Sequence, residues 1–475
     1  MGYLKVYTRE AQMPHYPRAL ADSVHMAYVG RDGRQQLLNQ GYGILYPEAV
    51  IQSDNTIAPR GIRNPRILAL EEGYGILAEP VDAEGNPMHG EELILWRTAD
   101  FLRFQRETAD RGTWQPVYDG AQQQQELPDA MWEHIRQRWS MPEVGLQRVD
   151  FPLAVGWADP VIFSWQDKWY FLATNDNNNN IGLFIREAGS VAGLFAPEAE
   201  SCCILDYDED REFIQTFWAP ELHVIGGEAY ILFAVSGRQW GPQCHMMRLK
   251  KGGRLTEPAD WETPVRVCRR DGSFLAETGI SLDMTYFRAG GTSYLVWSYR
   301  FGIGTAADTG SMLYIATMDE SKPWMLTSEP VLLSRPLYGW ENQRGTINNE
   351  GPYPLLLGDK VYLAYSGGGA CDPTYAVGYL VAQQQADLLD VRNWYKEPAA
   401  MLHRGSVEGI EGPGHNSFFW NEKGELMVAY HAQEMDRHHM RCTTFHRVYI
   451  NGQGMPLLHV PLEDGTDFGS KTSKY

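Results

Sequence analysis

The chain has 475 residues, more than one compact domain usually contains unless a structural unit is repeated. Hydrophobic residues make up 43%, enough for a sizeable core, and the net charge of −19 argues against nucleic acid and anionic membranes as partners. No run of 18 apolar residues occurs, so we expect no transmembrane helix.

The six cysteines predict the cellular compartment. None stands in a Cys-x-x-Cys spacing, which indicates reduced thiols and not a disulfide framework or a zinc site. Residues 1–5 show no basic segment followed by an apolar one, so no signal peptide is visible. We therefore expect a cytoplasmic protein, although a secreted form cut after a signal peptide would look the same.

The first 145 residues are expected to form a β-rich accessory region that ends in a connector. Strand-like stretches occur at residues 24–29, 64–70, 74–78 and 93–96. The unit that starts at Asn64 copies the layout of later units, but an amide cannot act as a base at neutral pH. The connector holds a polar loop with four glutamines at 122–125 and a short helix around 129–139.

A strand–turn–strand unit begins at Trp157-Ala158-Asp159-Pro160. An apolar run follows, then a polar turn at 166–168 and a second apolar run at 169–173, which predicts an antiparallel hairpin. The proline favours an extended conformation for Asp159. We therefore expect its carboxylate at the entrance of a strand.

Variants of this unit recur four times downstream. The five strand entrances lie at Asp159, Glu221, Asp283, Glu350 and His415, with spacings of 62, 62, 67 and 65 residues. Alternating strands in five units of near-constant length predict an all-β fold, a five-bladed β-propeller over residues 146–475. The first strand of each blade lines the central channel, so the entrances are expected to converge.

Three carboxylates at one axis suit hydrolysis of a glycosidic bond. An inverting reaction needs an acid and a base about 6.5–9.5 Å apart, and Asp159 and Glu350 lie on non-adjacent blades. The acid must have a raised pKa, and Asp283 on the blade between could supply the neighbouring charge. A structural explanation exists for each alone: Asp-Pro often caps a strand, and a buried Asp283 could pair with an arginine. Their shared position in the repeat favours catalysis.

The side chains around these acids have more open interpretations. Trp157 and Trp218 precede strand entrances and are predicted to line a sugar pocket, with core packing as the alternative. Glu221 is equally consistent with supporting the site and with a purely structural role. His415 follows a glycine-rich entrance, and a lone histidine is usually a hydrogen-bonded core residue, although it could hold a metal completed mostly by water. His431 and His438-His439 lie nearby in sequence.

The motifs resemble glycoside hydrolase family 43 over roughly residues 150–462. They are Trp-Ala-Asp-Pro at 157–160, Phe-Trp-Ala-Pro-Glu at 217–221, Ser-Leu-Asp at 281–283, Asn-Glu-Gly-Pro at 349–352 and Gly-Pro-Gly-His-Asn-Ser at 412–417. The resemblance implies a five-bladed β-propeller and inverting hydrolysis. It makes Asp159 the general base, Asp283 the group that modulates the pKa and orients the acid, and Glu350 the general acid. No cofactor is required, although His415 matches a histidine that helps hold a central calcium in several members.

Within the family, residues 340–352, 365–367 and 372–375 look like exo-acting α-L-arabinofuranosidases. The expected activity is release of terminal arabinofuranosyl residues from arabino-oligosaccharides or fragments of arabinan and arabinoxylan. Tyr365 joins Trp157, Trp218 and Glu221 as a candidate substrate-binding residue. A β-xylosidase and a catalytically silent sugar-binding propeller are the alternatives. The expected partner is a small oligosaccharide, and formation of a homo-oligomer is left open.

Overall fold

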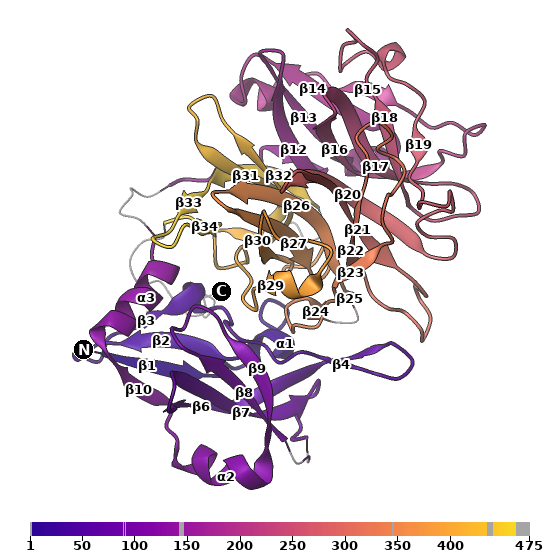
Figure 1. The fold of residues 1–475 in the computed structure, drawn as a ribbon. Helices are drawn as coiled ribbons and strands as arrows, with labels where there is room; N and C mark the ends of the chain where they lie inside the picture. Colours follow the sequence, from indigo (N-terminus) through magenta and orange to yellow (C-terminus); the bar gives the residue numbers. More distant parts are fainter. Residues whose placement is uncertain are drawn as a thin grey trace.

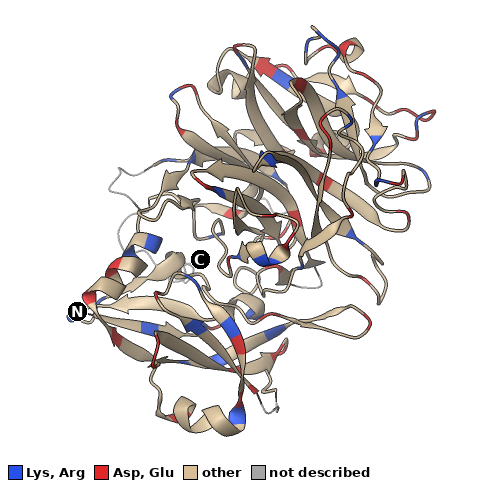
Figure 2. Cartoon of the chain, viewed as in Figure 1, with Lys and Arg blue, Asp and Glu red and all other residues tan. Residues whose placement is uncertain are grey.

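The computed structural model describes residues 2–88, 90, 92–141, 147–343, 346–434 and 440–461. Over these residues the fold is all-β with few helices, as predicted. Figure 1 shows the N-terminal residues, in indigo and purple, below a larger body of sheets formed by the rest of the chain. Charged side chains of both signs are scattered over the two parts (Figure 2). No described helix has the length and apolar character needed to cross a membrane.

Two four-stranded antiparallel sheets make up most of the N-terminal part and share one apolar core. The strands of the first sheet are, in order, β10 (Gln124–Leu127), β1 (Gly2–Tyr7), β2 (His25–Val29) and β3 (Gln35–Leu37). Those of the second are β6 (Arg60–Ala69), β7 (Tyr74–Asp82), β8 (Glu92–Thr98) and β9 (Gln105–Asp110). A hairpin of β4 (Val50–Ile51) and β5 (Ile57–Ala58) and the helix α1 (Arg18–Ala21) complete it.

The stretch predicted as a connector contains more regular structure than expected. Helix α3 (Asp129–Trp139) confirms the predicted short helix, but Arg111–Gly120 forms a further helix, α2, which the sequence analysis missed. The prediction of a polar loop at the glutamine run is wrong, because β10 pairs with β1 there. This strand lies at a sheet edge and only one of its four residues is buried, so it lacks the apolar alternation that marks a strand. The predicted boundary between residues 145 and 146 lies outside the described residues.

Beyond residue 153 the described residues contain five more four-stranded antiparallel sheets. The first is β12 (Trp157–Trp165), β13 (Lys168–Asn175), β14 (Leu183–Ala188) and β15 (Cys202–Leu205), and the second is β16 (Gln215–Ile225), β17 (Glu228–Ser236), β18 (Gln243–Arg248) and β19 (Val265–Arg266). The third is β20 (Ile280–Ala289), β21 (Thr292–Arg300), β22 (Met312–Thr317) and β23 (Val331–Ser334). The fourth is β26 (Asn349–Leu357), β27 (Lys360–Gly367), β28 (Ala376–Gln383) and β29 (Tyr395–Lys396).

The fifth sheet joins the two ends of this larger body. It contains β30 (Ile410–Trp420), β31 (Leu426–Glu434) and β32 (Cys442–Arg447), and its outermost strand is β11 (Ala154–Val155) from the start of the body. Two hairpins, β24 (Asn342–Gln343) with β25 (Thr346–Ile347) and β33 (Tyr449–Ile450) with β34 (Pro456–Leu457), lie outside the sheets. Short 3-10 turns occupy Leu38–Gly41, Asp176–Asn178, Ala192–Phe195, Pro258–Asp260 and Val391–Asn393.

The five sheets contact one another in a closed cycle. The first strands touch in the order β12, β16, β20, β26, β30 and back to β12. An apolar core lies between each neighbouring pair of sheets. The second strands are therefore covered on both faces, which explains why β17 reads as a near-continuous apolar run. The starts of the first strands meet at one end of the cycle.

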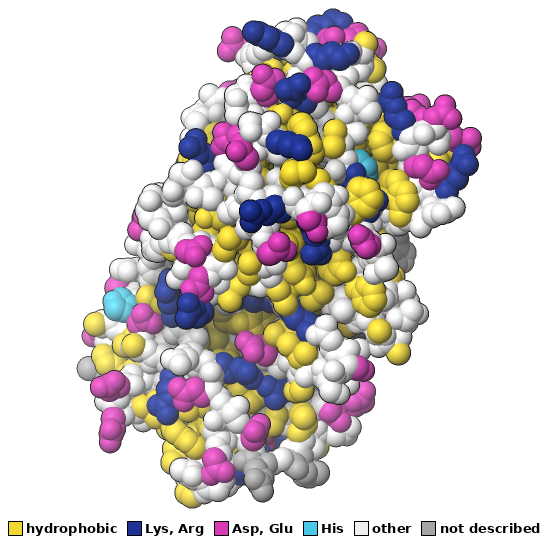
Figure 3. Space-filling view, turned by 45° about the vertical axis from the view of Figure 1, so that its right-hand side comes forward, with side chains coloured by type: hydrophobic (Ala, Val, Ile, Leu, Met, Phe, Trp, Pro, Cys, Tyr) yellow, Lys and Arg dark blue, Asp and Glu magenta, His cyan; other side chains and the backbone are white. Residues whose placement is uncertain are grey.

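The N-terminal part is fastened to the larger body through apolar packing and hydrogen bonds. Tyr16, Leu20 and Tyr46 belong to the same core cluster as Trp340 and Tyr365. Hydrogen bonds cross the junction as well: Asn39 Nδ2 donates to the carbonyl of Ala400 at 3.2 Å and Arg335 Nη1 to Asn55 Oδ1 at 2.7 Å. On the face shown in Figure 3, hydrophobic side chains gather in a hollow where the two parts meet.

Candidate active site

The first strand of each of the five sheets carries an irregularity near its start. The strand register shifts between Ala158 and Val161 in β12 and between Leu282 and Thr285 in β20, and β30 has similar shifts. Asp159, Asp283 and His415 lie at these bulges with left-handed φ angles of 53°, 53° and 47°. A bulge re-aims the side chain it carries. The same device in three strands brings these three side chains together.

The extended conformation predicted for Asp159 from the following proline is wrong. The backbone N–H of Asp159 donates to Nδ1 of His431 at 3.2 Å, and its carboxylate has several partners. A left-handed residue other than glycine costs about 1–3 kcal/mol. These tertiary contacts offset that cost and outweigh the extended preference that Pro160 imposes. Aspartate tolerates this conformation better than most residues.

The common register predicted for all five entrances holds for three of them. In β26 the left-handed residue is Gly351, with φ 54°, so Glu350 precedes the bulge by one position. In β16 they are Thr216 and Ala219, with φ 56° and 45°, and Glu221 follows Ala219 by two positions. A Cβ on Gly351 would lie 3.0 Å from the His415 ring, so both the φ angle and the close approach require glycine there.

Asp159 is 5% exposed and its two carboxylate oxygens have different partners. Thr174 Oγ1 donates to Oδ2 at 2.6 Å. Oδ1 lies 3.2 Å from Nη1 of Arg441 and 3.3 Å from Nδ1 of His415. Burial alone would raise the pKa of Asp159, but His415, Arg441 and His431 together hold this pKa well below 3.8. The carboxylate is therefore ionised at neutral pH.

Arg441 and His431 hold Asp159 in place. Arg441 also donates from Nη2 and Nε to both oxygens of Asp176, at 2.6 and 2.9 Å, which fixes the plane of its guanidinium. His431 Nε2 lies 3.1 Å from the carbonyl of Ala370. Burial lowers the pKa of His431, and its Nδ1 lies 3.2 Å from the backbone N of Asp159 and 3.1 Å from Asp159 Oδ1, so one ring nitrogen contacts both the backbone and the carboxylate.

Asp283 and Glu350 lie in the opposite electrostatic situation. Oδ2 of Asp283 accepts from Ser298 Oγ and from the N–H of Gly351, each at 3.1 Å. Burial raises the pKa of Asp283 most. His415 lowers this pKa, the charge of Asp159 raises it, and the net pKa is raised. Glu350 accepts a hydrogen bond from the hydroxyl of Tyr375 at 2.9 Å. Burial and the charge of Asp283 raise the pKa of Glu350 to about 7.

His415 supplies positive charge among these acids. Burial alone would lower its pKa, but Asp159, Asp283, Glu350 and Glu221 together raise it. Its backbone N–H donates to Ser366 Oγ at 2.7 Å, which anchors the residue at its bulge. An imidazolium here offsets part of the repulsion among the carboxylates.

The two tryptophans differ in their surroundings. Trp157 packs edge-on against Phe171 and Phe184, under the guanidinium of Arg186, within an apolar core. This packing favours the core alternative for Trp157. Trp218 is half-buried, and its indole nitrogen has no hydrogen-bond partner among the described residues. The next residue, Ala219, donates its N–H to Thr174 Oγ1, the group that binds Asp159. Trp218 therefore lies next in sequence to a residue that contacts the partner of Asp159, and its role in sugar binding stays a prediction.

Glu221 and Tyr365 lie deeper than a substrate-binding role requires. Glu221 Oε2 lies 2.6 Å from Nε2 of His223, and the residue is buried. Tyr365 is fully buried, and its hydroxyl donates to Glu341 Oε1 at 2.7 Å. These contacts do not support direct substrate contact for Tyr365. The charge of Glu221 contributes to the raised pKa of His415, and a role of Glu221 at the site stays a prediction.

Sequence reasoning missed several residues that complete the site: Thr174, Ser298, Tyr375 and Arg441 as partners of the acids, Asp176 as a partner of Arg441, and the contact of His431 with Asp159. Thr174 could have been inferred, because it directly follows the strand predicted at 169–173 and pairs with Ala158. The signal for Arg441 was weak, since 282 residues separate it from Asp159. His438 and His439 lie outside the described residues.

The predicted involvement of His415 in a calcium site was compared with the donors around it. The described residues contain no group of three or more His, Cys, Asp or Glu side chains that could hold a metal ion. Calcium takes about six to eight oxygen ligands, whereas His415 offers nitrogen and its Nδ1 faces Asp159. These donors do not fit a calcium held by protein side chains. A calcium held mainly by water beside His415 stays a prediction.

Comparison with known proteins gives consistent matches. The sequence model of glycosyl hydrolases family 43 matches residues 152–456. An extracellular exo-α-(1→5)-L-arabinofuranosidase from Streptomyces avermitilis is 33% identical over 328 residues, 66% of this chain and 64% of that protein. An enzyme of the same name from Streptomyces chartreusis is 33% identical over 285 residues, 60% of this chain and 82% of that protein. The crystal structure of an α-L-arabinofuranosidase from Lactobacillus brevis matches with a TM-score of 0.57 and 29% identity, covering 68% of this chain and all of that one.

The names of the two Streptomyces relatives contradict the predicted cytoplasmic location, since both are called extracellular. That prediction rested partly on unpaired cysteines. Burial raises the pKa of Cys244 and raises that of Cys203 to about 11. A thiol must ionise to attack a disulfide, so such cysteines stay unpaired without a reducing compartment.

The family model and the relatives agree with the family that the short motifs indicated. The match spans most of the larger body of sheets, from before β12 to the hairpin of β33 and β34. It includes every carboxylate of the site described above. The chain therefore belongs to glycosyl hydrolases family 43.

Proposed function

We propose that the protein is an inverting exo-acting glycosidase that releases terminal α-L-arabinofuranosyl residues from arabino-oligosaccharides. The names of the two Streptomyces relatives point to (1→5)-linked substrates. The observation that carries the proposal is the opposite protonation of two buried acids. Asp159 has a pKa well below 3.8, whereas burial and Asp283 raise the pKa of Glu350 to about 7. Two carboxyl groups with divergent pKa values are the usual arrangement of a base and an acid.

The roles follow from these protonation states. Asp159, ionised and held by Arg441 and Thr174, accepts a proton from the attacking water. Glu350, protonated and oriented by Tyr375, gives its proton to the departing oxygen. Asp283 keeps the pKa of Glu350 high and binds the adjacent backbone. For inversion, the carboxyl groups of Asp159 and Glu350 must lie about 6.5–9.5 Å apart, with the water between base and sugar.

We also propose that residues 146–475 form a five-bladed β-propeller and that residues 1–145 are an accessory region. The cyclic contacts of β12, β16, β20, β26 and β30 support this arrangement. The five inter-sheet cores support it as well. Pairing of β11 with β32 would close the ring by joining its first and last segments. The relatives' names support action outside the cell.

Initial rates on two aryl glycosides test the proposal. The purified protein should hydrolyse p-nitrophenyl α-L-arabinofuranoside, and the β-D-xyloside should be a much poorer substrate. The Asp159→Asn variant, which keeps the size of the side chain but cannot act as a base, serves as the control and should be nearly inactive. Faster hydrolysis of the xyloside would make the enzyme a β-xylosidase, and activity on neither substrate would count against a glycosidase of this specificity.

A further inference from the structure

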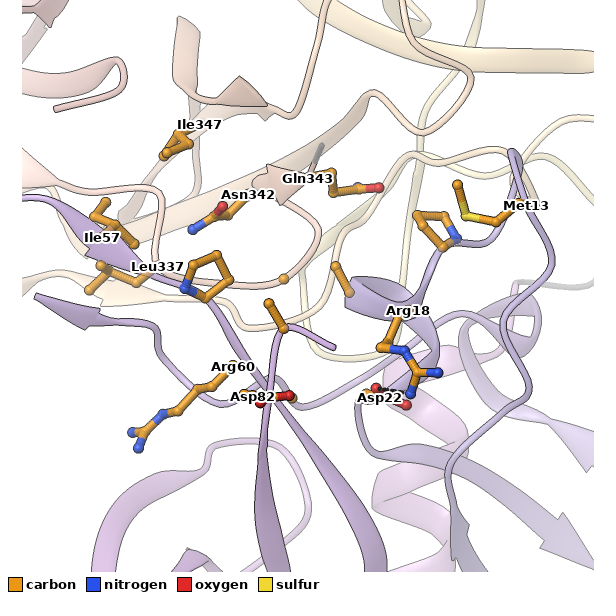
Figure 4. Close-up of a pocket in the computed structure, with 16 residues that line it drawn as sticks. Met13, Arg18, Asp22, Ile57, Arg60, Asp82, Leu337, Asn342, Gln343 and Ile347 are labelled. Atoms are coloured by element: carbon orange, nitrogen blue, oxygen red, sulfur yellow. Dashed lines mark hydrogen bonds and ion pairs between the residues drawn. The ribbon is translucent and has the colours of Figure 1, made fainter. Parts of the chain in front are cut away.

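A cavity of about 480 Å3 lies between the N-terminal part and the segment at 337–347 (Figure 4). Its N-terminal wall comes from α1, the start of β6 and the turn after β7. The described residues of the opposite wall are Leu337, Gly339, Asn342, Gln343 and Ile347. The size falls in the usual range of small-molecule sites, about 300–1,000 Å3. Much of the wall is apolar, with contributions from Pro17, Ile57, Pro59, Leu337 and Ile347.

The hairpin of β24 and β25 leads directly into the strand that carries Glu350. Asn342 pairs with Ile347, and Glu350 follows three residues later, one position into β26. An extended chain spans at most about 3.6 Å per residue, so the Cα atoms of Ile347 and Glu350 are within about 11 Å of each other. Adding one cross-strand spacing of about 5.5 Å places Asn342 within about 16 Å of Glu350. A short oligosaccharide can cover such a distance.

The polar groups of the cavity suit a neutral ligand. Two cations and two carboxylates line it, Arg18, Arg60, Asp22 and Asp82, and Arg18 Nη1 lies 3.2 Å from Asp22 Oδ2. Their charges balance, so the site selects neither an anion nor a cation. Guanidinium groups donate and carboxylates accept hydrogen bonds, which matches hydroxyl groups that do both. The apolar wall offers a surface for the apolar face of a sugar ring.

Two amides on the other wall have unused hydrogen-bonding capacity. Asn342 Nδ2 and Gln343 Oε1 have no hydrogen-bond partner within the described part of the chain, although both residues are more than nine-tenths buried. Leaving such a group unpaired costs about 1–3 kcal/mol. Figure 4 shows these two side chains on one side of the cavity and Arg60, Asp82 and Asp22 on the other. Both amide atoms have almost no accessible surface, so a ligand with several hydroxyl groups could pair with them only after the amides turn toward the cavity.

We propose that this cavity binds neutral pentose units on the leaving-group side of the substrate. The proposal rests on the proposed function, because it takes the substrate to be an arabino-oligosaccharide. It gives the N-terminal part a role in recognising substrate length. Short aryl glycosides would use only the catalytic centre, whereas longer chains would also occupy the cavity.

Filling the cavity tests this proposal. Ala83 lines the cavity and is exposed, so Ala83→Trp places an indole there without disturbing the core. Ala99→Trp is the matched control, since Ala99 is exposed in the same part of the chain and does not line the cavity. We expect Ala83→Trp to lower kcat/KM for α-1,5-arabinopentaose about tenfold, the loss of one or two net hydrogen bonds. Its kcat/KM for p-nitrophenyl α-L-arabinofuranoside should stay within twofold of wild type.

A second variant is needed because the new indole of Ala83→Trp could turn toward solvent and leave the cavity empty. Arg18→Ala removes a donor from the N-terminal wall and should lower kcat/KM for the pentaose about threefold, again without effect on the aryl substrate. Ala99→Trp should change neither value. If both cavity variants keep the wild-type ratio between the pentaose and the aryl glycoside, the cavity is not part of the substrate site.

Binding separates failure of this inference from failure of the proposed function. Calorimetric titration of Glu350→Gln with arabinopentaose measures affinity without turnover. Weaker binding in Glu350→Gln/Ala83→Trp supports the cavity, and equal binding contradicts it. If the wild-type enzyme hydrolyses no arabinofuranoside, the proposed function is wrong, whatever the titration shows.

Discussion

The Oδ2 atom of Asp283 accepts a hydrogen bond from the backbone N–H of Gly351 at 3.1 Å. Gly351 directly follows Glu350, so one carboxylate both holds the backbone beside the proposed acid and places negative charge near it. Burial and this charge raise the pKa of Glu350 to about 7. The position and the protonation of Glu350 therefore depend on the same neighbour.

Removing the charge of Asp283 should change the pH profile. Glu350 must be protonated to act, so activity falls as pH rises through its pKa, near 7 in the wild type. Asp283→Asn keeps the side chain's size but removes the charge, which lowers the pKa of Glu350. The alkaline limb of kcat/KM should therefore move to lower pH. An unchanged limb, with only a uniform loss of rate, would show that Asp283 acts by position alone.

Loss of the acid should depend on the leaving group. Nitrophenol leaves with little protonation, so Glu350→Ala should retain more activity on aryl arabinosides than on arabino-oligosaccharides. Asp159→Ala removes activation of water, which every substrate needs, so its loss should be similar on both. General acid and base contributions are typically about 10²–10⁴-fold each, so rates resolve the difference. Equal leaving-group sensitivity, or retention of anomeric configuration by NMR, would overturn the roles.

Arg441 should keep Asp159 ionised at low pH. Burial raises the pKa of Asp159, but His415 and Arg441 lower it, and the pKa lies well below 3.8. Arg441→Gln should raise this pKa, so the base is protonated earlier as pH falls and the acid limb of kcat/KM moves to higher pH. Asp176→Asn leaves the guanidinium charge in place and should shift the limb less. An unchanged acid limb in Arg441→Gln would contradict this role of Arg441, and identical shifts in both variants would mean that Arg441 acts only while Asp176 holds its guanidinium.

Asn64 should not contribute to turnover. It lies at a bulge like that of Asp159, with φ 49°, but its side chain is exposed and Nδ2 donates to Glu79 Oε2 at 3.0 Å. Asn64→Ala should leave kcat/KM within a few-fold of wild type on aryl and oligosaccharide substrates. A loss comparable to that of Asp159→Ala would place this sheet in the active site.

Tyr365 should affect stability and not substrate affinity. Its buried hydroxyl donates to Glu341 Oε1, which also lies 2.7 Å from Lys396 Nζ. Tyr365→Phe removes that hydrogen bond and should lower the free energy of unfolding by about 1–3 kcal/mol, seen as a lower Tm. KM should be unchanged. A large rise in KM with an unchanged Tm would instead support the substrate-binding role predicted for it.

Much of the architecture follows from local sequence. The apolar runs with polar turns between them predict the hairpins, because burial of alternating or continuous apolar residues depends mainly on neighbours in the chain. The paired runs that follow Asp159 and Asp283 form strands as predicted. The recurrence of the unit also indicates that Asp159, Asp283 and His415 share a position, which their φ angles support. The edge strand β10 was not predicted, because polar edge strands lack a clear pattern. Helix α2 was not predicted either.

Protonation and fine position are decided by contacts that the sequence does not display. Pro160 favours an extended Asp159, yet His431 and Arg441, more than 250 residues away, hold it in the left-handed region. Coulomb interactions depend on distance in space and on burial, and neither can be read from spacing along the chain. The cavity at the junction is a further example, because its walls come from residues 13–83 and 337–347. The sequence by itself determined which acids are available, and the tertiary structure decided which of them carries a proton.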